Sequence, residues 1–356
     1  MLKKIFALLI CLCLLCGMCP AHAEMTKYSA SFFGVFDTVI DVIGYAESEE
    51  IFNEELAQVK RIYGHLNELF DNYNAYEGVN NLYVLNQTAM NEPVTVEPEL
   101  FELLLWAQQN QRLYGSSQVN IAMGSVLSIW HEYRENGLLM PDLAQVPPMD
   151  KLQQAAEHTD IFNLVLDTEA MTVFYADPDL RLDLGAIAKG FATEKAAQYL
   201  LSSRMPSFII SAGGNVRAGI SPADGRKNWG VGVQDPNNVA YGAGGYVDIL
   251  YLNGLSAVTS GDYQRYYMVG DKRYHHLISP ITLMPTDYCR SVTVITEDSA
   301  WADYMSTTLF LMPQEDGLKL VNSMDGIEAL WIMDNGQMIG SAGIAQYART
   351  FGATAN

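Results

Sequence analysis

The sequence predicts an α+β protein in which a helix-rich first third packs with a strand-rich remainder. Residues 49–72 and 97–114 carry apolar side chains at helical spacing. After the break at Pro147 and Pro148, short runs of β-branched and aromatic residues alternate with glycine-rich turns over residues 207–298. Helices and strands that are segregated along a chain are typical of α+β folds, whereas a repeating βαβ pattern would indicate a parallel sheet.

The other elements follow from local pattern. Residues 31–44 are expected to form one early strand, and residues 121–137 a third helix. A polar loop rich in Asn and Tyr should cover residues 71–81. Residues 171–184 suggest a β-hairpin that leads into a helix over residues 185–203. Later strands and a last helix are expected at Phe208–Ile210, Trp229–Val233, Tyr246–Tyr251, Ser291–Ile295 and Ser299–Leu311.

The first 23 residues have the pattern of a secretory signal. Lys3 and Lys4 precede an apolar run over residues 5–19, and Ala21-His22-Ala23 offers small residues at a cleavage site. The run is shorter than the ~20 apolar residues of a membrane span, although an uncleaved anchor is the alternative. We therefore expect an exported protein whose residues 24–356 form one domain, since no Pro- or Gly-rich linker divides them.

Cysteine content and charge restrict the remaining possibilities. Only Cys289 lies beyond the signal, so the exported body has no internal disulfide. The formal net charge is −20, and it becomes about −22 without Lys3 and Lys4. So acidic a body repels nucleic acid and anionic lipid surfaces, which argues against both as partners. A polyphosphate ligand would require a bound cation to screen its charge.

The segment Leu182–Gly190 is the first of five that mix glycine, small polar residues and charges. Asp183 ends a run of strand-like residues, and Lys189 follows one turn into a helix that opens with small residues. The start of a helix offers free N–H groups to an anion such as phosphate. An ordinary helix start with a solvated lysine is the alternative.

Two further segments lie at strand ends. The pair Gly213-Gly214 permits positive φ angles and close approach of a ligand to the backbone. Thr259 and Ser260 carry hydroxyl groups that could bind phosphate oxygens. A plain hairpin turn and a capped turn explain these residues equally well when each segment is considered alone.

The last two segments hold histidines and a carboxylate. Of the adjacent His275 and His276, at most one should point into a given site, because neighbouring side chains on a strand face opposite sides. Asp303 and Thr307 share one helix face and offer oxygen ligands of the kind that Mg²⁺ prefers. No Cys/His cluster suggests zinc, and both the dinucleotide fingerprint and the Walker-type Gly-Lys-Ser/Thr motif are missing.

Taken in order, the segments resemble the ApbE family of FAD:protein FMN transferases from roughly residue 27 to 348. The likeness is densest over residues 182–312. The motifs there are Asp-Leu-Gly-Ala-Ile-Ala-Lys-Gly, Gly-Gly-Asn, Trp-x-Val-Gly-x-x-Asp-Pro, Thr-Ser-Gly-Asp, a His followed by two hydrophobic residues, and Ala-Asp-x-x-Ser-Thr. The resemblance implies an ApbE-like, T-fold-like body that requires Mg²⁺ and uses FAD as a substrate.

The resemblance also implies roles for individual residues. Mg²⁺ would be held by the carbonyl oxygen of Ala186 and by Asp303 and Thr307. Asp303 and His276 are the catalytic candidates for accepting a proton. The residues that would bind FAD are Phe36, Tyr73, Gln118, Val119, Asn120, Asp183, Lys189, Gly213, Gly214, Thr259, Ser260 and His276.

Some positions depart from the family pattern. Ser279 replaces the usual Asp before Pro280, and Leu283 replaces a common Gly in the turn that follows. Asn120 and Ala122 replace the frequent Asp and Thr. None of these changes removes a metal ligand that the resemblance implies.

In the reaction that the resemblance implies, a Thr or Ser hydroxyl of a target protein attacks the phosphorus on the FMN side of FAD, and AMP leaves. The expected acceptor is an extracytoplasmic domain of a membrane-bound redox flavoprotein. Two other interpretations remain open. With water as the acceptor the same site would be an FAD pyrophosphatase that gives FMN and AMP, and without catalysis the chain would be an exported FAD-binding protein.

Overall fold

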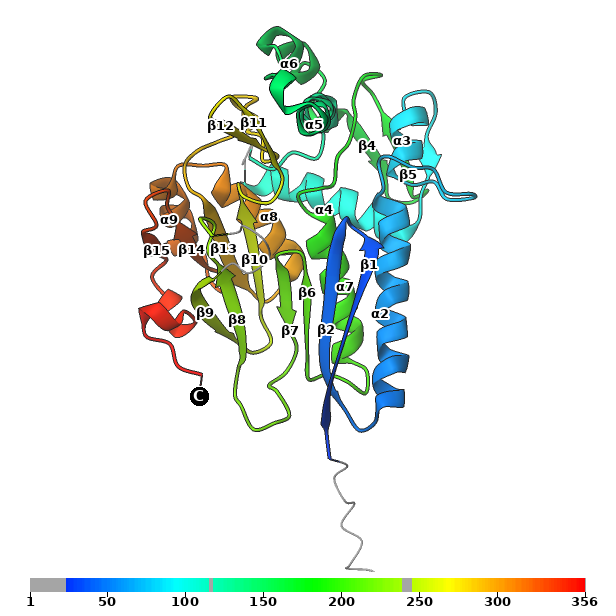
Figure 1. Ribbon diagram of the computed structural model, residues 1–356. Helices are drawn as coiled ribbons and strands as arrows, with labels where there is room; N and C mark the ends of the chain where they lie inside the picture. The colour runs from blue at the N-terminus through cyan, green and yellow to red at the C-terminus, as the bar shows by residue number, and fades with distance from the viewer. Residues whose placement is uncertain (1–23, 115–117, 239–244, 356) are drawn as a thin grey trace, which may run out of the picture.

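The centre of the protein is an eight-stranded sheet in which each strand is antiparallel to its neighbours (Figure 1). The computed structural model describes residues 24–114, 118–238 and 245–355, so the expected signal lies outside the described residues. In spatial order the strands are β1 (Thr26–Val35), β2 (Thr38–Ala46), β6 (Phe208–Ala212), β7 (Asn215–Ala218), β10 (Ser256–Gly261), β13 (Ser291–Thr296), β14 (Glu328–Ile332) and β15 (Met338–Gly340).

Helices pack on one face of this sheet, and a two-stranded hairpin packs on the other. The hairpin consists of β8 (Trp229–Gln234) and β9 (Tyr246–Leu252). Alternation along β10 separates two cores, because Val258 packs among the helices while Ala257 packs against the hairpin.

The α-helices of the described residues are α2 (Glu49–Phe70), α3 (Leu82–Thr88), α4 (Pro98–Tyr114), α5 (Gly124–Leu139), α6 (Met149–Ala156), α7 (Ala188–Leu201), α8 (Ser299–Phe310) and α9 (Gln314–Asn322).

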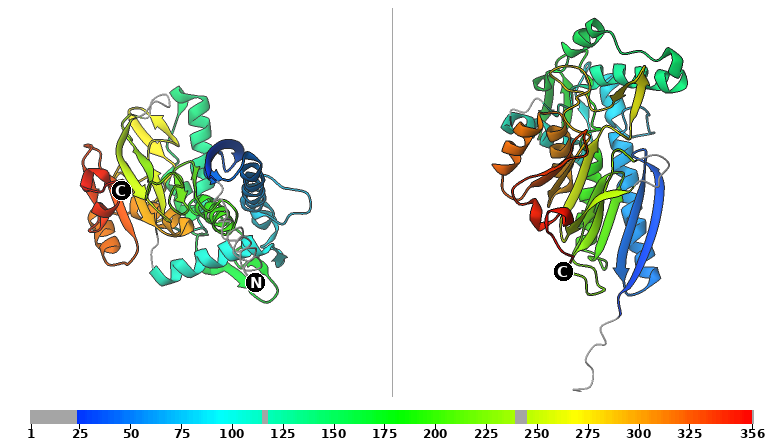
Figure 2. Two further views of the ribbon diagram at one scale, coloured as in Figure 1. Left: turned by 90° about the horizontal axis from the view of Figure 1, so that it is seen from below. Right: turned by 60° about the vertical axis from the view of Figure 1, so that its left-hand side comes forward.

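A smaller upper part stands on the end of the sheet (Figures 1 and 2). It contains α5, α6, the hairpin β11 (Tyr266–Val269) and β12 (Lys272–His275), and a sheet of β3 (Val94–Thr95), β5 (Thr172–Tyr175) and β4 (Leu164–Asp167). Short 3₁₀ turns occur at Pro141–Leu143, Ile161–Asn163, Ile344–Gln346 and Arg349–Phe351. Among the described residues, no helix has the length and apolar character needed to span a bilayer.

The α+β prediction is confirmed, and the long predicted helices begin and end within a few residues of α2, α4, α5 and α8. The single strand predicted over residues 31–44 was wrong. The chain instead turns back at Phe36 and Asp37, which have φ angles of 51° and 49°, and forms the β1–β2 hairpin. Asp tolerates positive φ better than most residues, but a bulky aromatic residue such as Phe36 rarely adopts it, so the sequence gives little signal for this turn.

The hairpin predicted over residues 171–184 was also wrong. Its first part is β5, which forms an antiparallel pair with the preceding strand, β4. The later residues carry buried leucines without strand pairing; at Leu182 the side chain of Asn86 bonds both the backbone N–H (2.8 Å) and the carbonyl (2.9 Å). The alternating apolar pattern therefore reflects burial. The following helix begins at Ala188, three residues later than predicted.

Candidate active site

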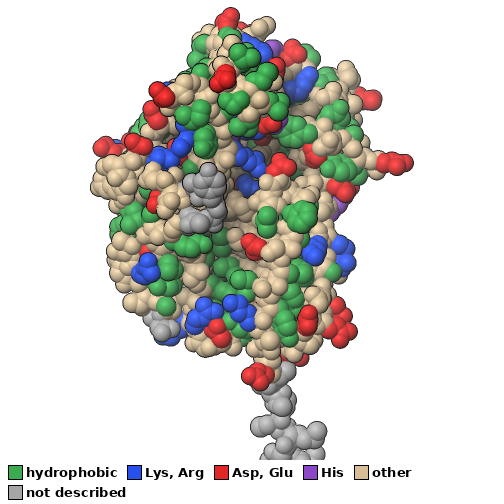
Figure 3. Space-filling view, viewed as in Figure 1, with side chains coloured by type: hydrophobic (Ala, Val, Ile, Leu, Met, Phe, Trp, Pro, Cys, Tyr) green, Lys and Arg blue, Asp and Glu red, His purple; other side chains and the backbone are tan. Residues whose placement is uncertain are grey.

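A cavity of about 600 Å³ lies between the end of the main sheet and the upper part. The space-filling view shows a hollow there, with basic side chains beside it (Figure 3). Of the predicted site residues, Gly214 alone does not line this cavity; it lines a neighbouring one of about 270 Å³ that shares Thr259. The predicted residues that line the larger cavity are Phe36, Tyr73, Gln118, Val119, Asn120, Asp183, Ala186, Lys189, Gly213, Thr259, Ser260, His276, Asp303 and Thr307.

The junction of α7 and α8 presents the strongest oxygen cluster. Asp303 on α8 is only 4 % exposed, and its Oδ2 accepts a 2.8 Å hydrogen bond from the backbone N–H of Gly190 on α7. Gly190 is the third residue of α7, so its N–H is one of the donors that a helix start leaves without an intrahelical partner. The Ala186 carbonyl, in the turn before α7, accepts no hydrogen bond from any described residue. An unpaired backbone acceptor therefore stands at the cavity wall beside a buried carboxylate.

Gly190 allows the two helices to approach this closely. A Cβ atom at this position would lie 2.5 Å from both the Asp303 Cβ and the Ser299 carbonyl oxygen. Such distances are far inside van der Waals contact, so any other residue would force α7 and α8 apart. The glycine in the Lys189-Gly190 pair thus has a packing role that the sequence pattern alone could not assign.

Hydroxyl groups from β10 and α8 complete this wall. Ser260 Oγ lies 2.9 Å from Ser306 Oγ and 3.3 Å from Thr307 Oγ1. Thr259, the preceding residue on β10, pairs its hydroxyl at 2.8 Å with that of Thr293. Alternation along the strand therefore places only Ser260 beside the α8 hydroxyls.

Asp183 and Lys189 lie on either side of the α7 start. Asp183 Oδ1 accepts a 2.8 Å hydrogen bond from Gly185 N–H, and its Oδ2 accepts a 3.2 Å bond from the Asn72 side chain. Burial raises the pKa of the Asp183 carboxyl even though these bonds act in the opposite direction. The tight turn from Asp183 to Gly185 leaves Lys189 in the cavity lining, in the first turn of the helix.

His276 is half-buried and lies just past the end of β12. Its Nδ1 donates to the Arg265 carbonyl at 3.2 Å, which leaves Nε2 as the free acceptor of the neutral ring. Burial, with help from the Arg265 guanidinium, lowers the pKa of His276 to about 3. His275 also lines the cavity and bonds the Thr286 carbonyl through Nε2 at 2.7 Å. Its Nδ1 accepts from Leu277 N–H at 3.2 Å, so both ring nitrogens of His275 are bonded to the backbone and only His276 of the pair has a free ring nitrogen.

The opposite wall comes from the N-terminal half. Phe36 is fixed by a 2.8 Å bond from its N–H to Asn67 Oδ1. Tyr73 is 57 % exposed and its ring lies 5.2 Å from that of His131. Asn120 donates to the Thr159 carbonyl at 2.8 Å and accepts from Ala122 N–H at 2.9 Å, so the amide that replaces the family's usual Asp makes use of both its donor and its acceptor.

Two cationic residues of the cavity were not predicted from the sequence. Arg134 on α5 and Arg265 before β11 line it together with Lys189. The low content of basic residues suggested that few cations could meet a polyphosphate, but the fold brings three of them to one place. Arg134 stands one turn beyond Trp130 and His131, which also line the cavity. Residues one helical turn apart share a face, so knowing which face of α5 lies toward the cavity would have identified Arg134.

The two departures near Pro280 preserve the local turn. Ser279 Oγ accepts bonds from Ile281 N–H at 3.2 Å and Thr282 N–H at 3.3 Å, as an Asp side chain does in such turns. Leu283 has a φ of 60°, a conformation that glycine favours, and its carbonyl accepts from Trp130 Nε1 at 2.9 Å. Neither Ser279 nor Leu283 lines the cavity.

Comparisons with known proteins agree with the resemblance in the motifs. The model of the ApbE family matches residues 36–331. The chain is 30 % identical to an FAD:protein FMN transferase of Treponema pallidum, covering 97 % of this chain and 95 % of that protein. It is 29 % identical to one of Klebsiella pneumoniae, covering 82 % and 86 %.

Solved structures agree on the fold. The crystal structure of the ApbE protein from Thermotoga maritima superposes with a TM-score of 0.77 at 27 % identity, over 90 % of this chain and 99 % of that one. The flavin transferase ApbE from Vibrio cholerae gives 0.73 at 22 % identity, over 91 % and 99 %. With its motifs, its fold and most of its length in agreement, the chain belongs to the ApbE family.

Proposed function

We propose that this chain is a Mg²⁺-dependent FAD:protein FMN transferase that joins FMN to a Thr or Ser hydroxyl of a target protein and releases AMP. The observation that carries the proposal is the group of oxygens at the α7–α8 junction, where Asp303, Thr307 and the unpaired Ala186 carbonyl line one cavity with Lys189. The relatives from Treponema pallidum and Klebsiella pneumoniae carry the name of this activity.

The residues present fit a magnesium ion. Mg²⁺ binds oxygen ligands and commonly keeps several waters. Asp303 Oδ1 is not used in any hydrogen bond among the described residues, since Gly190 N–H takes Oδ2. Asp303, Thr307 and Ala186 would supply the protein's oxygens, and the bound ion would neutralise charge on the diphosphate and polarise the scissile P–O bond.

The cavity also fits FAD. Its volume of about 600 Å³ lies within the range of cofactor sites, roughly 300–1,000 Å³. Phe36 and Tyr73 provide an aromatic wall for a flavin ring, while Lys189, Arg134 and Arg265 provide positive charge for phosphate oxygens. The basic residues therefore compensate locally for the acidic character of the whole chain.

The reaction forms one bond and breaks one. The oxygen of the acceptor hydroxyl bonds to the FMN-side phosphorus, the P–O bond to AMP breaks, and the hydroxyl proton passes to a base. Asp303 and His276 are the candidates for that base. A pKa of about 3 makes His276 a weak base near neutral pH, so its neutral Nε2 is better suited to accept a hydrogen bond that orients a group in the cavity.

The acceptor in this proposal is an extracytoplasmic domain of a membrane-bound redox flavoprotein. Support comes from the N-terminal sequence, whose lysines, apolar run and Ala-x-Ala site have the pattern of an export signal. An exported transferase would meet its acceptor and FAD outside the cytoplasm.

Mass spectrometry tests the activity. The chain is incubated with FAD and Mg²⁺, with and without a purified extracytoplasmic redox protein. A gain in acceptor mass equal to FMN minus water, together with AMP, supports the transferase. FMN and AMP formed equally well without acceptor would identify a pyrophosphatase instead, and FAD that binds but yields no AMP under any condition would overturn both.

A further inference from the structure

Two histidines outside the cavity each lie close to two carboxylates. His65 on α2 lies beside Glu97 and Glu99 at the start of α4, and His158 lies beside Asp177 and Asp179. The proposed transferase reaction uses neither group. Their geometries differ in a way that matters for metal binding.

At His158 the two carboxylates lie at different ring nitrogens. Asp177 bonds Nδ1 at 2.9 Å, and Asp179 stands 3.9 Å from Nε2. The Nδ1 atom of His158 is therefore already taken by a hydrogen bond to Asp177. This group is an ordinary hydrogen-bonded ion pair with a second charge nearby.

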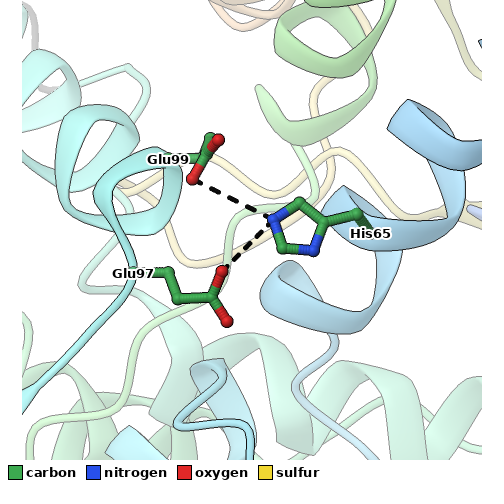
Figure 4. Close-up of side chains that lie close together, drawn as sticks. All are labelled: His65, Glu97 and Glu99. Atoms are coloured by element: carbon green, nitrogen blue, oxygen red, sulfur yellow. Dashed lines mark ion pairs between the residues drawn. The ribbon is translucent and has the colours of Figure 1, made fainter.

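At His65 both carboxylates converge on one ring nitrogen. Glu97 Oε2 lies 3.3 Å and Glu99 Oε2 lies 4.0 Å from Nε2, as Figure 4 shows. The shorter contact is nevertheless not a hydrogen bond, and the His65 ring makes none to any described residue. The three atoms therefore surround a common point, an arrangement that is typical of ligands around an ion.

The spacing matches a tetrahedral zinc shell. Zinc bonds to His nitrogen and carboxylate oxygen at about 2.0–2.2 Å, which places neighbouring ligand atoms about 3.3–3.5 Å apart. Glu97 already has this spacing from Nε2, and Glu99 needs only a small side-chain rotation. A nitrogen ligand favours zinc over Mg²⁺, which takes oxygen ligands.

The surroundings favour a cation. Among the described residues, neither Glu97 nor Glu99 has a Lys or Arg within 4.0 Å, so His65 is their only ion-pair partner. The side chains of His65 and Glu97 are 43 % and 47 % exposed, which leaves the remaining coordination positions open to water. We propose that His65, Glu97 and Glu99 form a surface zinc site that is separate from the catalytic cavity.

Such a site would join α2 to the start of α4. His65 precedes Asn67 on α2, and Asn67 holds the Phe36 N–H at the cavity wall. Phe70 and Asp71, at the end of the same helix, also line the cavity. A bound zinc ion would therefore stabilise the part of α2 that carries this wall.

Isothermal titration with Zn²⁺ in excess Mg²⁺ tests the site, using the chain from residue 24. All described helices and strands lie beyond that point, and the removed segment contains four cysteines and His22, which would bind zinc themselves. We expect one Zn²⁺ per chain and a rise in melting temperature. His65→Ala and Glu97→Gln should each weaken binding about 100-fold and remove the thermal shift.

His158→Ala is the matched control and should bind Zn²⁺ like the parent. Asp303→Asn should also bind normally, which separates this site from the catalytic one. Circular dichroism checks that each variant is folded, and Glu99→Gln serves if one of the others is not. The proposal is overturned if the parent shows no saturable Zn²⁺ binding, if His65→Ala binds as tightly as the parent, or if His158→Ala loses binding equally.

Discussion

The backbone N–H of Gly190 donates a 2.8 Å hydrogen bond to Asp303 Oδ2, and this bond joins the start of α7 to the middle of α8. It satisfies one of the N–H donors that the start of α7 leaves without an intrahelical partner. This contact fixes the Asp303 carboxylate at the wall of the cavity, which Ala186 also lines. Helix packing and the proposed metal site depend on the same pair of residues.

Asp303→Asn separates the charge of this residue from its structural bond. The Asn side-chain oxygen can still accept from Gly190 N–H, so the free energy of unfolding should change by less than about 1 kcal/mol. Loss of the anionic ligand should lower FMN transfer by about 100-fold or more. Chemical denaturation and AMP release measure the two effects.

Asp303→Ala provides the contrast. It removes the acceptor as well as the charge, and it should cost about 1–3 kcal/mol of stability in addition to activity. If Asp303→Asn retained normal transfer in Mg²⁺, the metal role of this carboxylate would be wrong.

Gly190→Ala should destabilise the protein by about 1–3 kcal/mol, because the new Cβ would lie 2.5 Å from Asp303 Cβ and Ser299 O. Gly64→Ala on α2 is the matched control. A Cβ there meets no heavy atom within 4 Å, and Ala is favoured over Gly in a helix by about 1 kcal/mol. Urea unfolding should show opposite signs for the two changes, and equal signs would contradict the packing role of Gly190.

Much of the fold could be predicted because it follows from periodicity. The apolar stripe of α2 and the β-branched run of β13 give clear signals of helix and strand. The β1–β2 turn could not be predicted, since Phe36 and Asp37 adopt positive φ only because the hairpin and Asn67 hold them there. Residues 176–184 were wrongly predicted as part of a hairpin for a similar reason. The side chain of Asn86, and not a neighbouring strand, bonds the backbone of Leu182.

Some residues of the candidate site could likewise be predicted from the sequence and others could not. Motifs in the sequence identified residues of α7, of α8 and of the turn before α7 that line the cavity, such as Lys189, Asp303 and Ala186. Arg134 and Arg265 stand in no motif and reach the cavity only through tertiary structure. The role of the Gly190 N–H could not be predicted from the sequence either, because it depends on how closely α7 approaches α8.

His276 should make stability depend on pH. Its pKa is lowered from 6.5 to about 3 in the folded protein, so below pH 6.5 the unfolded chain binds a proton that the folded chain does not. Stability contributed by the neutral ring is therefore full above pH 6.5 and is lost as the pH falls toward 3. His276→Asn should reduce this loss in urea unfolding measured between pH 7 and 4.

His158 should contribute a pH dependence of stability with the opposite sign, and it serves as the control. Its hydrogen bond to Asp177 raises its pKa, so its contribution is full below the unfolded value and is lost as the pH rises through the folded one. His158→Ala should therefore make stability fall more steeply as the pH drops. An unchanged pH profile for His276→Asn would show that this ring is not held neutral.

Ser279→Ala should cost about 1 kcal/mol of stability, because the N–H groups of Ile281 and Thr282 lose their shared acceptor. Ser279→Asp keeps an acceptor oxygen at this turn and should be milder than the alanine change. The comparison is made by thermal and urea unfolding. No loss of stability in Ser279→Ala would mean that the hydroxyl does not hold the turn.

The central claim is tested most directly by a crystal structure of the chain with FAD and Mg²⁺. The account predicts the ion at about 2.0–2.1 Å from the Ala186 carbonyl oxygen and from Asp303, with Thr307 in its coordination sphere. Gly190 N–H should still bond Asp303 in that complex. An ion or a diphosphate bound away from the α7–α8 junction would contradict the account.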